Sequence, residues 1–321
     1  LAGVDLVKYI MAFAVVAIHF RPNFDADWEY PFLFEWFIRL AVPYFFITSG
    51  FLLERRLASM PDWHDRRNAI IRKTGRLFKL WVVWLAISLP LAIYSYSYAL
   101  QDGNIADTIK SYAYGLIVNG WAPRAAPLWF IYSMIWVFLI IAVSQRLKHY
   151  KFKLIMAFAV LTFMYWAAPL TQNPYLNLLK TYTSHLLSGG IYILSGMILH
   201  DCKKTNSYSF AAICIAVSLA LGYFKMPYNP VIGGIGLFAI ALKLPLRATA
   251  RTLSLRYQSM WIYYLHEYVL FATFILLSMK DFMSNPWLMM AVVFFFVAFL
   301  AYVMNRLQNQ PRYKVLNFLV S

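Results

Sequence analysis

The chain has 321 residues, of which 62% are hydrophobic, 19% are aromatic and 13% are charged. Because a soluble globular domain carries about 25% charged residues, this composition excludes an ordinary water-soluble enzyme, and the high apolar content excludes a disordered chain. A membrane protein that crosses the bilayer several times remains. In such a protein a net charge of +16 indicates basic cytoplasmic loops, so no nucleic-acid partner is predicted.

Ten apolar segments follow one another along the chain, with no soluble domain and no internal repeat. A hydrocarbon core about 30 Å thick needs roughly 20 apolar residues per helix. The segments approach this length at residues 5–20, 33–53, 77–100, 128–143, 154–170, 186–199, 209–224, 231–246, 259–279 and 287–304. The predicted fold is all-α: a polytopic membrane protein of about ten transmembrane helices, forming a single domain over residues 1–321. The longest connections are expected at residues 54–76 and 101–127.

The 29 Lys and Arg residues are distributed unevenly between the two sides of the predicted membrane. With the N-terminus inside, about 22 of them fall in or beside cytoplasmic connections and about six fall outside, so the positive-inside rule predicts that both termini are cytoplasmic. The first apolar run lacks a basic n-region and a cleavage site, and is expected to be a retained span. Cys202 and Cys214 belong to no metal or redox motif.

Lys8 and His19 share one face of the first apolar segment. They are eleven residues apart, which returns to nearly the same side of a helix about 16 Å further along its axis. Ionisable side chains within spans usually face protein or water, so a cation near the cytoplasm and an imidazole further out are expected along a passage across the bilayer. Alternatively, Lys8 extends to the lipid headgroups and His19 is merely satisfied by a neighbouring helix.

Glu35 and Arg39 lie four residues apart in the second segment, a spacing that permits an ion pair. Both are expected at the depth of His19, where a carboxylate that orients the imidazole would complete a general-base device. A purely structural ion pair is the alternative. The ninth segment contributes two further ionisable residues, His266 and Glu267.

A basic cluster lies where the third segment begins on the predicted cytoplasmic side. It consists of Arg72, Lys73, Arg76 and Lys79. Such a cluster can hold phosphate groups through charge and bidentate hydrogen bonds. The alternative is that it sets the topology and contacts anionic lipid.

Several of these stretches resemble the acyltransferase 3 family of bacterial integral-membrane acyltransferases. Lys8 and His19 match the (Arg/Lys)-x10-His pattern of the family's opening helix. Residues 39–52 are similar to the signature V-P-x-F-F-x-x-S-G-F, which is the most specific of the matches. Arg76 and Lys79 lie where the family has Arg-x-x-Arg, and the lysine departs from that pattern.

Two later stretches extend the resemblance to nearly the full length. Residues 127–130 resemble the family's L-W-F/Y motif, and residues 262–266 resemble its Y-Y-x-H motif. On this basis Trp129 and His266 are predicted to bind substrate.

The resemblance implies a bacterial cytoplasmic-membrane enzyme with ten core helices and acetyl-CoA, or a similar cytoplasmic thioester, as acyl donor. The acceptor would be a hydroxyl of an envelope glycan or a lipid-linked molecule presented at the lipid membrane. The resemblance further implies that His19 of the (Arg/Lys)-x10-His pattern is catalytic and that Arg76 and Lys79 bind the donor. Lys8, the basic residue of that pattern, is predicted to bind the donor as well. Arg72 joins this donor site through its place in the basic cluster.

The predicted mechanism is direct transfer, in which His19 removes a proton from the acceptor hydroxyl as that oxygen attacks the thioester. Arg39 would stabilise the oxyanion or orient the acceptor, with Glu35 as its partner or that of His19. A covalent acyl-histidine is an alternative. No metal is predicted.

Two other functions compete with acyl transfer. The first two segments also resemble the membrane domain of vancomycin-resistance serine racemases, which favours a serine transporter as the alternative. A transporter would often show broken helices repeated in two halves, and no such symmetry is visible. The third possibility is a catalytically inactive helper subunit of an envelope assembly.

Overall fold

The computed structural model describes residues 1–23, 29–101, 105–120, 125–171, 189–202, 207–278 and 285–319. Within these ranges the regular structure is helical and contains no strand, which confirms the predicted all-α fold. The elements are α1 (Ala2–Asn23), α2 (Phe32–Arg39), α3 (Ala41–Leu57), α4 (Trp63–Gln101), α5 (Ile105–Tyr114), the π-helical turn η1 (Gly115–Asn119), the 3-10 turn η2 (Ala126–Leu128), α6 (Trp129–Ser144), α7 (Tyr150–Thr171), α9 (Gly190–Asp201), α10 (Tyr208–Tyr223), α11 (Asn229–Lys243), α12 (Ala250–Ser278), α13 (Pro286–Gln308) and η4 (Pro311–Leu319).

Each predicted apolar segment corresponds to helix, although residues 186–188 and Met279 fall outside the described ranges. In the described part of the chain, six helical stretches are long and apolar enough to cross a membrane: Ala2–Phe20, Phe32–Leu57, Trp63–Ser97, Ala126–Ser144, Tyr150–Ala167 and Pro286–Gln308. The helices α10 and α11 are apolar but shorter. Ten spans and two cytoplasmic termini therefore remain predictions.

The second predicted segment is two helices rather than one. Helix α2 ends at Arg39 and α3 begins at Ala41. Pro43 has no N–H for the carbonyl of Arg39, and in a continuous helix its ring would clash with that carbonyl. The predicted segment over residues 33–53 is therefore interrupted at this junction, although Phe32–Leu57 together are long and apolar enough to cross a membrane once.

The connection predicted at residues 54–76 is largely helical, which corrects the expectation of a long loop. Helix α3 continues to Leu57 and α4 already begins at Trp63. Ala69, Ile70 and Thr74 are buried, so one face of this basic stretch packs against the protein and favours a helix. The predicted connection at residues 101–127 likewise contains α5 and η1.

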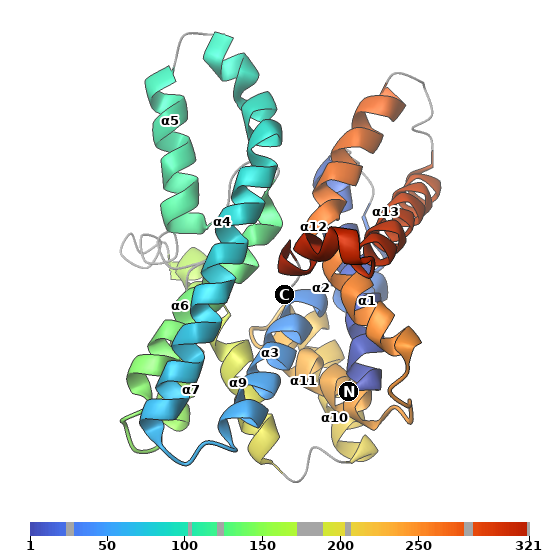
Figure 1. Ribbon diagram of the computed structural model, residues 1–321. Coiled ribbons are helices and arrows are strands. Elements are labelled where there is room, and N and C mark those ends of the chain that lie inside the picture. Colours follow the sequence, from blue (N-terminus) through green and yellow to red (C-terminus); the bar gives the residue numbers. More distant parts are fainter. Residues whose placement is uncertain are drawn as a thin grey trace.

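Figure 1 shows α4 to α7 on one side of the molecule and α12 with α13 on the other, with α3, α9 and α11 between them. Helices α3 and α9 share the most extensive contact. A Cβ atom on Gly50 would collide with the carbonyl oxygen of Ile193, and one on Gly196 would collide with that of Ile47. Small residues let membrane helices approach this closely. The glycine of the V-P-x-F-F-x-x-S-G-F signature is thus a packing element.

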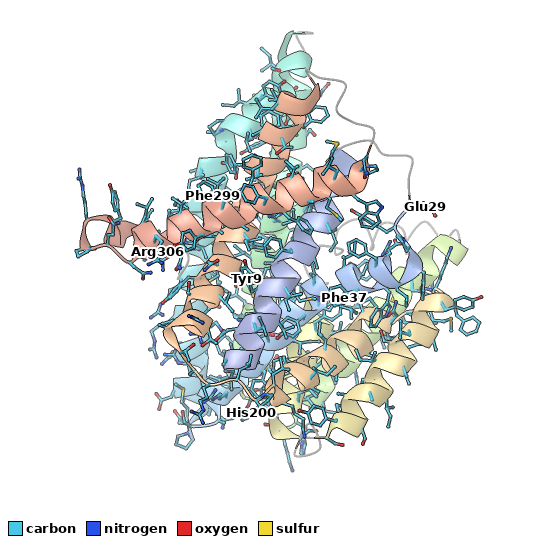
Figure 2. All side chains as sticks on the ribbon, turned by 90° about the vertical axis from the view of Figure 1, so that its right-hand side faces the viewer. Tyr9, Glu29, Phe37, His200, Phe299 and Arg306 are labelled. Atoms are coloured by element: carbon cyan, nitrogen blue, oxygen red, sulfur yellow. The ribbon has the colours of Figure 1, made fainter. Side chains whose placement is uncertain are left out.

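Helix α1 packs along α12. Near the start of both helices, Arg256 of α12 donates from Nε to Oδ1 of Asp5 at 2.9 Å and from Nη2 to Oδ2 at 2.8 Å. Further along both helices, His19 lies beside Glu267. Because both contacts proceed in chain order, α1 and α12 run in the same direction. Figure 2 shows α13, which carries Phe299, crossing α1.

The C-terminal turn η4 lies between α4 and α12 in Figure 1. Trp84 of α4 donates from Nε1 to the carbonyl oxygen of Leu319 at 2.9 Å. Trp261 of α12 donates from Nε1 to Oε1 of Gln308 at 2.8 Å. Both buried indole N–H groups are therefore satisfied, as buried tryptophans require, and they hold the C-terminal region against the helices.

Candidate active site

His19 of α1 and Glu267 of α12 form the centre of the candidate site. Nδ1 of His19 lies 3.3 Å from Oε1 of Glu267, and the two side chains are 23% and 7% exposed. A buried carboxylate needs a hydrogen-bond donor, so Glu267 favours the imidazole tautomer with its proton on Nδ1. Nε2 of His19 then carries the lone pair, which is the arrangement that a general base requires.

His266 lies directly beside this pair. The imidazole rings of His19 and His266 have centroids 5.2 Å apart. Nδ1 of His266 lies 2.7 Å from the carbonyl oxygen of Tyr263 and 3.3 Å from that of Ile262. Because a carbonyl oxygen only accepts, Nδ1 is the protonated nitrogen. Nε2 of His266 is buried and has no hydrogen-bond partner among the described residues.

A small pocket, with room for about one water molecule, reaches Glu267 from the side of α4 and η2. The aromatic rings of Trp84 and Tyr264 stack at 4.4 Å and 5°, and Tyr263 donates its hydroxyl to the carbonyl oxygen of Pro127. These contacts fix the wall of the pocket. The lining residues are Trp84, Ser88, Ala125, Pro127, Leu128, Tyr263, Tyr264, Glu267 and Tyr268.

Glu35 and Arg39 form the predicted ion pair, but with each other at an exposed position. Arg39 donates from Nε at 3.1 Å and from Nη2 at 2.6 Å to Oε1 of Glu35. Their side chains are 65% exposed for Arg39 and 34% for Glu35. The place beside His19 that the sequence suggested for Glu35 is occupied by Glu267. The catalytic roles of Glu35 and Arg39 remain predictions.

A second charged cluster lies near the opposite end of α1. Lys8 interacts electrostatically with Asp5 and with Arg256. Lys73 of α4 is repelled electrostatically by Lys8, and its Nζ lies 5.1 Å from the ring centroid of Phe138. The cluster therefore gathers the cationic groups of Lys8, Lys73 and Arg256 around the single carboxylate of Asp5, and the excess positive charge favours an anion nearby.

The other predicted donor-binding residues lie on a different face of α4. Arg72, Arg76 and Lys79 are exposed, whereas Lys73 is half-buried and its neighbour Thr74 is buried. The helical period explains the difference, because residues three and four positions apart share a face. Of the basic cluster predicted from sequence, the structure brings Lys73 to the side of Lys8.

Trp129 begins α6 and is half-buried. Its ring centroid lies 5.9 Å from that of Phe46 on α3. The preceding residues Pro127 and Leu128 line the pocket at Glu267. Trp129 therefore adjoins the pocket wall, and its role in substrate binding remains a prediction.

Lys73 was predicted only as a member of the basic cluster, and no role was predicted for Glu267 or Arg256. The available signal for Glu267 was a carboxylate next to His266 in an apolar helix, since such residues usually mark a site. That Lys73, and not its basic neighbours, lies on the side of Lys8 could be recognised only once the register of α4 was known. Arg256 precedes the predicted ninth segment, and its pairing with Asp5 is a tertiary contact.

The sequence also matches known proteins. A family profile described as an acyltransferase domain, Acyl_transf_3, matches residues 1–306. The chain belongs to the acyltransferase 3 family. This membership and the apolar helices identify a membrane protein whose family implies an acyltransferase activity.

Two curated relatives of this acyltransferase 3 chain are named as racemases. A serine/alanine racemase of Enterococcus gallinarum is 25% identical over 316 residues, which cover 88% of this chain and 43% of the relative. An amino-acid racemase of Enterococcus faecalis is 30% identical over 122 residues, which cover 37% of this chain and 16% of the relative. The chain thus spans less than half the length of either relative. No solved structure matches it.

Proposed function

We propose that this protein is an O-acyltransferase of the bacterial cytoplasmic membrane. It would move an acyl group, in the simplest case acetyl, from cytoplasmic acyl-CoA to a hydroxyl of an envelope carbohydrate or lipid-linked acceptor. The family membership supports the reaction class. The observation that carries the proposal is the contact between His19 and Glu267 beside a pocket.

The proposed chemistry uses His19 as general base and Glu267 as the group that orients it. Glu267 accepts the Nδ1–H bond of His19, which leaves Nε2 to take the proton of the acceptor hydroxyl. The acceptor oxygen forms a bond to the thioester carbonyl carbon, and the carbon–sulfur bond then breaks. The imidazolium returns the proton to the departing thiolate, so that an ester and free CoA thiol are formed.

The reacting hydroxyl of the acceptor is proposed to enter the small pocket lined by Trp84, Tyr264 and Tyr268. Aromatic faces and a small number of polar groups are typical of ligand pockets. Nε2 of His266 is buried and has no partner within the described residues. It is proposed to accept a hydrogen bond from an acceptor hydroxyl that displaces the pocket wall at Tyr263, whose carbonyl oxygen already contacts His266. This contact is the substrate-binding role that we propose for His266.

The donor is proposed to bind at the opposite end of α1. Lys8 and Lys73 supply positive charge toward the protein interior, and Arg72, Arg76 and Lys79 supply it on the exposed face of α4. Phosphate groups are held by such clusters through charge and bidentate hydrogen bonds. Lys8 and His19 are separated by about 16 Å along the helix, a distance that an extended pantetheine arm would have to span.

The test is incubation of detergent-purified protein with acetyl-CoA and candidate envelope glycans while free thiol is measured. Release of thiol is expected only when a suitable acceptor is present. The variant His19→Ala should abolish transfer while retaining donor binding, and Arg76→Ala should weaken donor binding. Full activity of His19→Ala would refute the proposed mechanism.

Serine transport is not favoured as an alternative, because the match to the acyltransferase family extends over residues 1–306. The racemase names of the relatives belong to proteins of which this chain spans only part. Serine uptake by proteoliposomes without thioester consumption would reverse this preference.

A further inference from the structure

Three potential metal ligands converge at the candidate active site. His19, His266 and Glu267 each offer one ligand atom, and these atoms all lie within 4.8 Å of one another. In a tetrahedral zinc site with bonds of about 2.0–2.2 Å, neighbouring ligand atoms lie roughly 3.4 Å apart. The distance of 3.3 Å between Nδ1 of His19 and Oε1 of Glu267 already matches one edge of such a tetrahedron.

His266 has the hydrogen bonding of a metal-binding histidine. Metal-ligating histidines usually donate their other ring N–H to a backbone carbonyl or carboxylate, which fixes the ring and the tautomer. Nδ1 of His266 makes this bond to the carbonyl oxygen of Tyr263 at 2.7 Å. Its Nε2 atom is buried without a hydrogen-bond partner in the described part of the structure, and the residue is 0% exposed.

An unpartnered buried nitrogen is costly, because it loses water without gaining another contact. A bound cation would remove that cost at Nε2 of His266. It would also neutralise part of the charge of Glu267, whose side chain is only 7% exposed. Burial, orientation and ligand type therefore agree at all three residues.

The small pocket at Glu267 has room for about one water molecule, which would be the fourth ligand. Glu267 lines this small pocket together with Ser88 and the tyrosines of α12. Three protein ligands with a fourth position open to water are typical of accessible zinc sites, whereas structural sites are closed by four protein ligands. Two imidazoles and one carboxylate suit zinc and neighbouring transition metals rather than Mg²⁺ or Ca²⁺.

We propose that His19, His266 and Glu267 bind a divalent transition-metal ion such as Zn²⁺, and that the bound ion inhibits acyl transfer. The inhibitory part rests on the function proposed above, and the binding part does not. An imidazole that binds the ion through Nδ1 keeps its proton on Nε2. His19 then has no lone pair with which to accept the proton of the acceptor hydroxyl.

Metal binding is tested without donor or acceptor. Purified protein is treated with a chelator and titrated with Co²⁺, followed by visible absorption, and with Zn²⁺, followed by calorimetry and by the shift in thermal midpoint, which rises when a ligand binds the folded state. One ion per chain is expected. His19→Ala, His266→Ala and Glu267→Gln should each weaken binding at least tenfold.

The variant His200→Ala is the matched control, because His200 lies at the lower edge of Figure 2 and contacts Asp201 at 3.3 Å. It should bind the ion as the wild type does. Glu267→Gln keeps the shape of the buried side chain, so it remains informative if His266→Ala fails to fold. Absence of saturable binding, or equal binding by wild type and Glu267→Gln, would overturn the proposal.

Inhibition is measured separately in the thiol-release assay. Zn²⁺ should suppress transfer at concentrations near its dissociation constant, and a chelator should restore it. Stimulation by Zn²⁺ would overturn the inhibitory part. Metal binding without any transfer activity would refute the proposed function and leave the metal site standing, whereas transfer without metal binding would do the reverse.

Discussion

Glu267 and His19 come from opposite ends of the sequence, and their side chains lie 3.3 Å apart at Oε1 and Nδ1. The carboxylate is buried and the imidazole partly so. A neutral hydrogen-bond acceptor at residue 267 would remove the charge that stabilises the imidazolium formed during proton transfer. Glu267 is therefore expected to affect the orientation of His19 without affecting the binding of the donor.

Replacing Glu267 by Gln is expected to lower kcat by about 10²- to 10⁴-fold, because the amide leaves the tautomer of His19 uncontrolled. The KM for acyl-CoA should change little, since the donor site lies at the other end of α1. Steady-state kinetics with varied donor measures both constants. Glu35→Gln is the comparison, and a larger loss from that variant would restore the orienting role to Glu35.

Lys73→Met should weaken donor binding about tenfold, or ~1.4 kcal/mol, because it removes the interior charge beside Lys8. The effect should shrink as ionic strength rises, since salt screens charge interactions. Binding of a non-hydrolysable CoA analogue measures it. If Arg76→Met weakens binding much more than Lys73→Met, the phosphates bind on the exposed face of α4 instead.

Gly50→Ala should destabilise the protein by roughly 1–3 kcal/mol, because the new methyl group meets the backbone of Ile193 and forces α3 and α9 apart. Gly75→Ala is the matched control within α4. No atom lies within 4 Å of a Cβ at that position, so the change should stabilise the helix by about 0.5–1 kcal/mol. Thermal unfolding in detergent compares the two variants, and equal melting behaviour would contradict the close helix contact.

Lys151→Met should destabilise the fold by roughly 3 kcal/mol, since it leaves a buried charge without its partner. Lys151 lies 2.7 Å from Oε1 of Glu54 and 2.6 Å from Oδ2 of Asp201, and the Glu54 side chain is 4% exposed. The exposed neighbour Lys153 provides the control, and Lys153→Met should change stability by less than about 0.5 kcal/mol. Similar losses for both variants in chemical unfolding would remove the special role of Lys151.

The predicted orientation is tested by labelling single cysteines, after replacement of Cys202 and Cys214, with a reagent that does not cross the membrane. Ser59→Cys lies between α3 and α4 and should react only from the cytoplasm. Asp107→Cys in α5 should react only from outside. The opposite pattern would invert the topology derived from the basic residues.

The positions of the apolar helices were predictable because burial in lipid or protein leaves a long uninterrupted apolar run. The break at Leu40 was present in the sequence as Pro43, whose effect reaches back four residues. The early start of α4 was not visible, since residues 63–76 are basic enough to look like a solvated loop. Only their packing through Ala69 and Ile70 makes them helical.

The candidate site was predictable one residue at a time but not as a set. His19 and His266 were recognisable as polar groups in apolar helices, and the structure brings them together. The carboxylate beside them could not be identified from sequence. Glu35 and Glu267 both lie in apolar segments, where an ionisable residue usually marks a functional site. Which of them faces His19 depends on the contact of α12 with α1, a contact between residues far apart in the chain.

The parallel pairing of α1 and α12 has a mechanical consequence. The Asp5–Arg256 and His19–Glu267 contacts are separated by roughly 21 Å along α1 and roughly 17 Å along α12, so sliding of one helix past the other would break both contacts at once. The two contacts together therefore fix the axial register of α12 against α1. Helix α4 meets α12 through aromatic side chains such as Trp84 on Tyr264, which can separate without breaking an ion pair. A hydrogen bond from Tyr268 to the carbonyl oxygen of Ile87 also joins α4 to α12. Helix α4 is thus held to α12 by neutral contacts, and α1 by contacts that involve charged side chains.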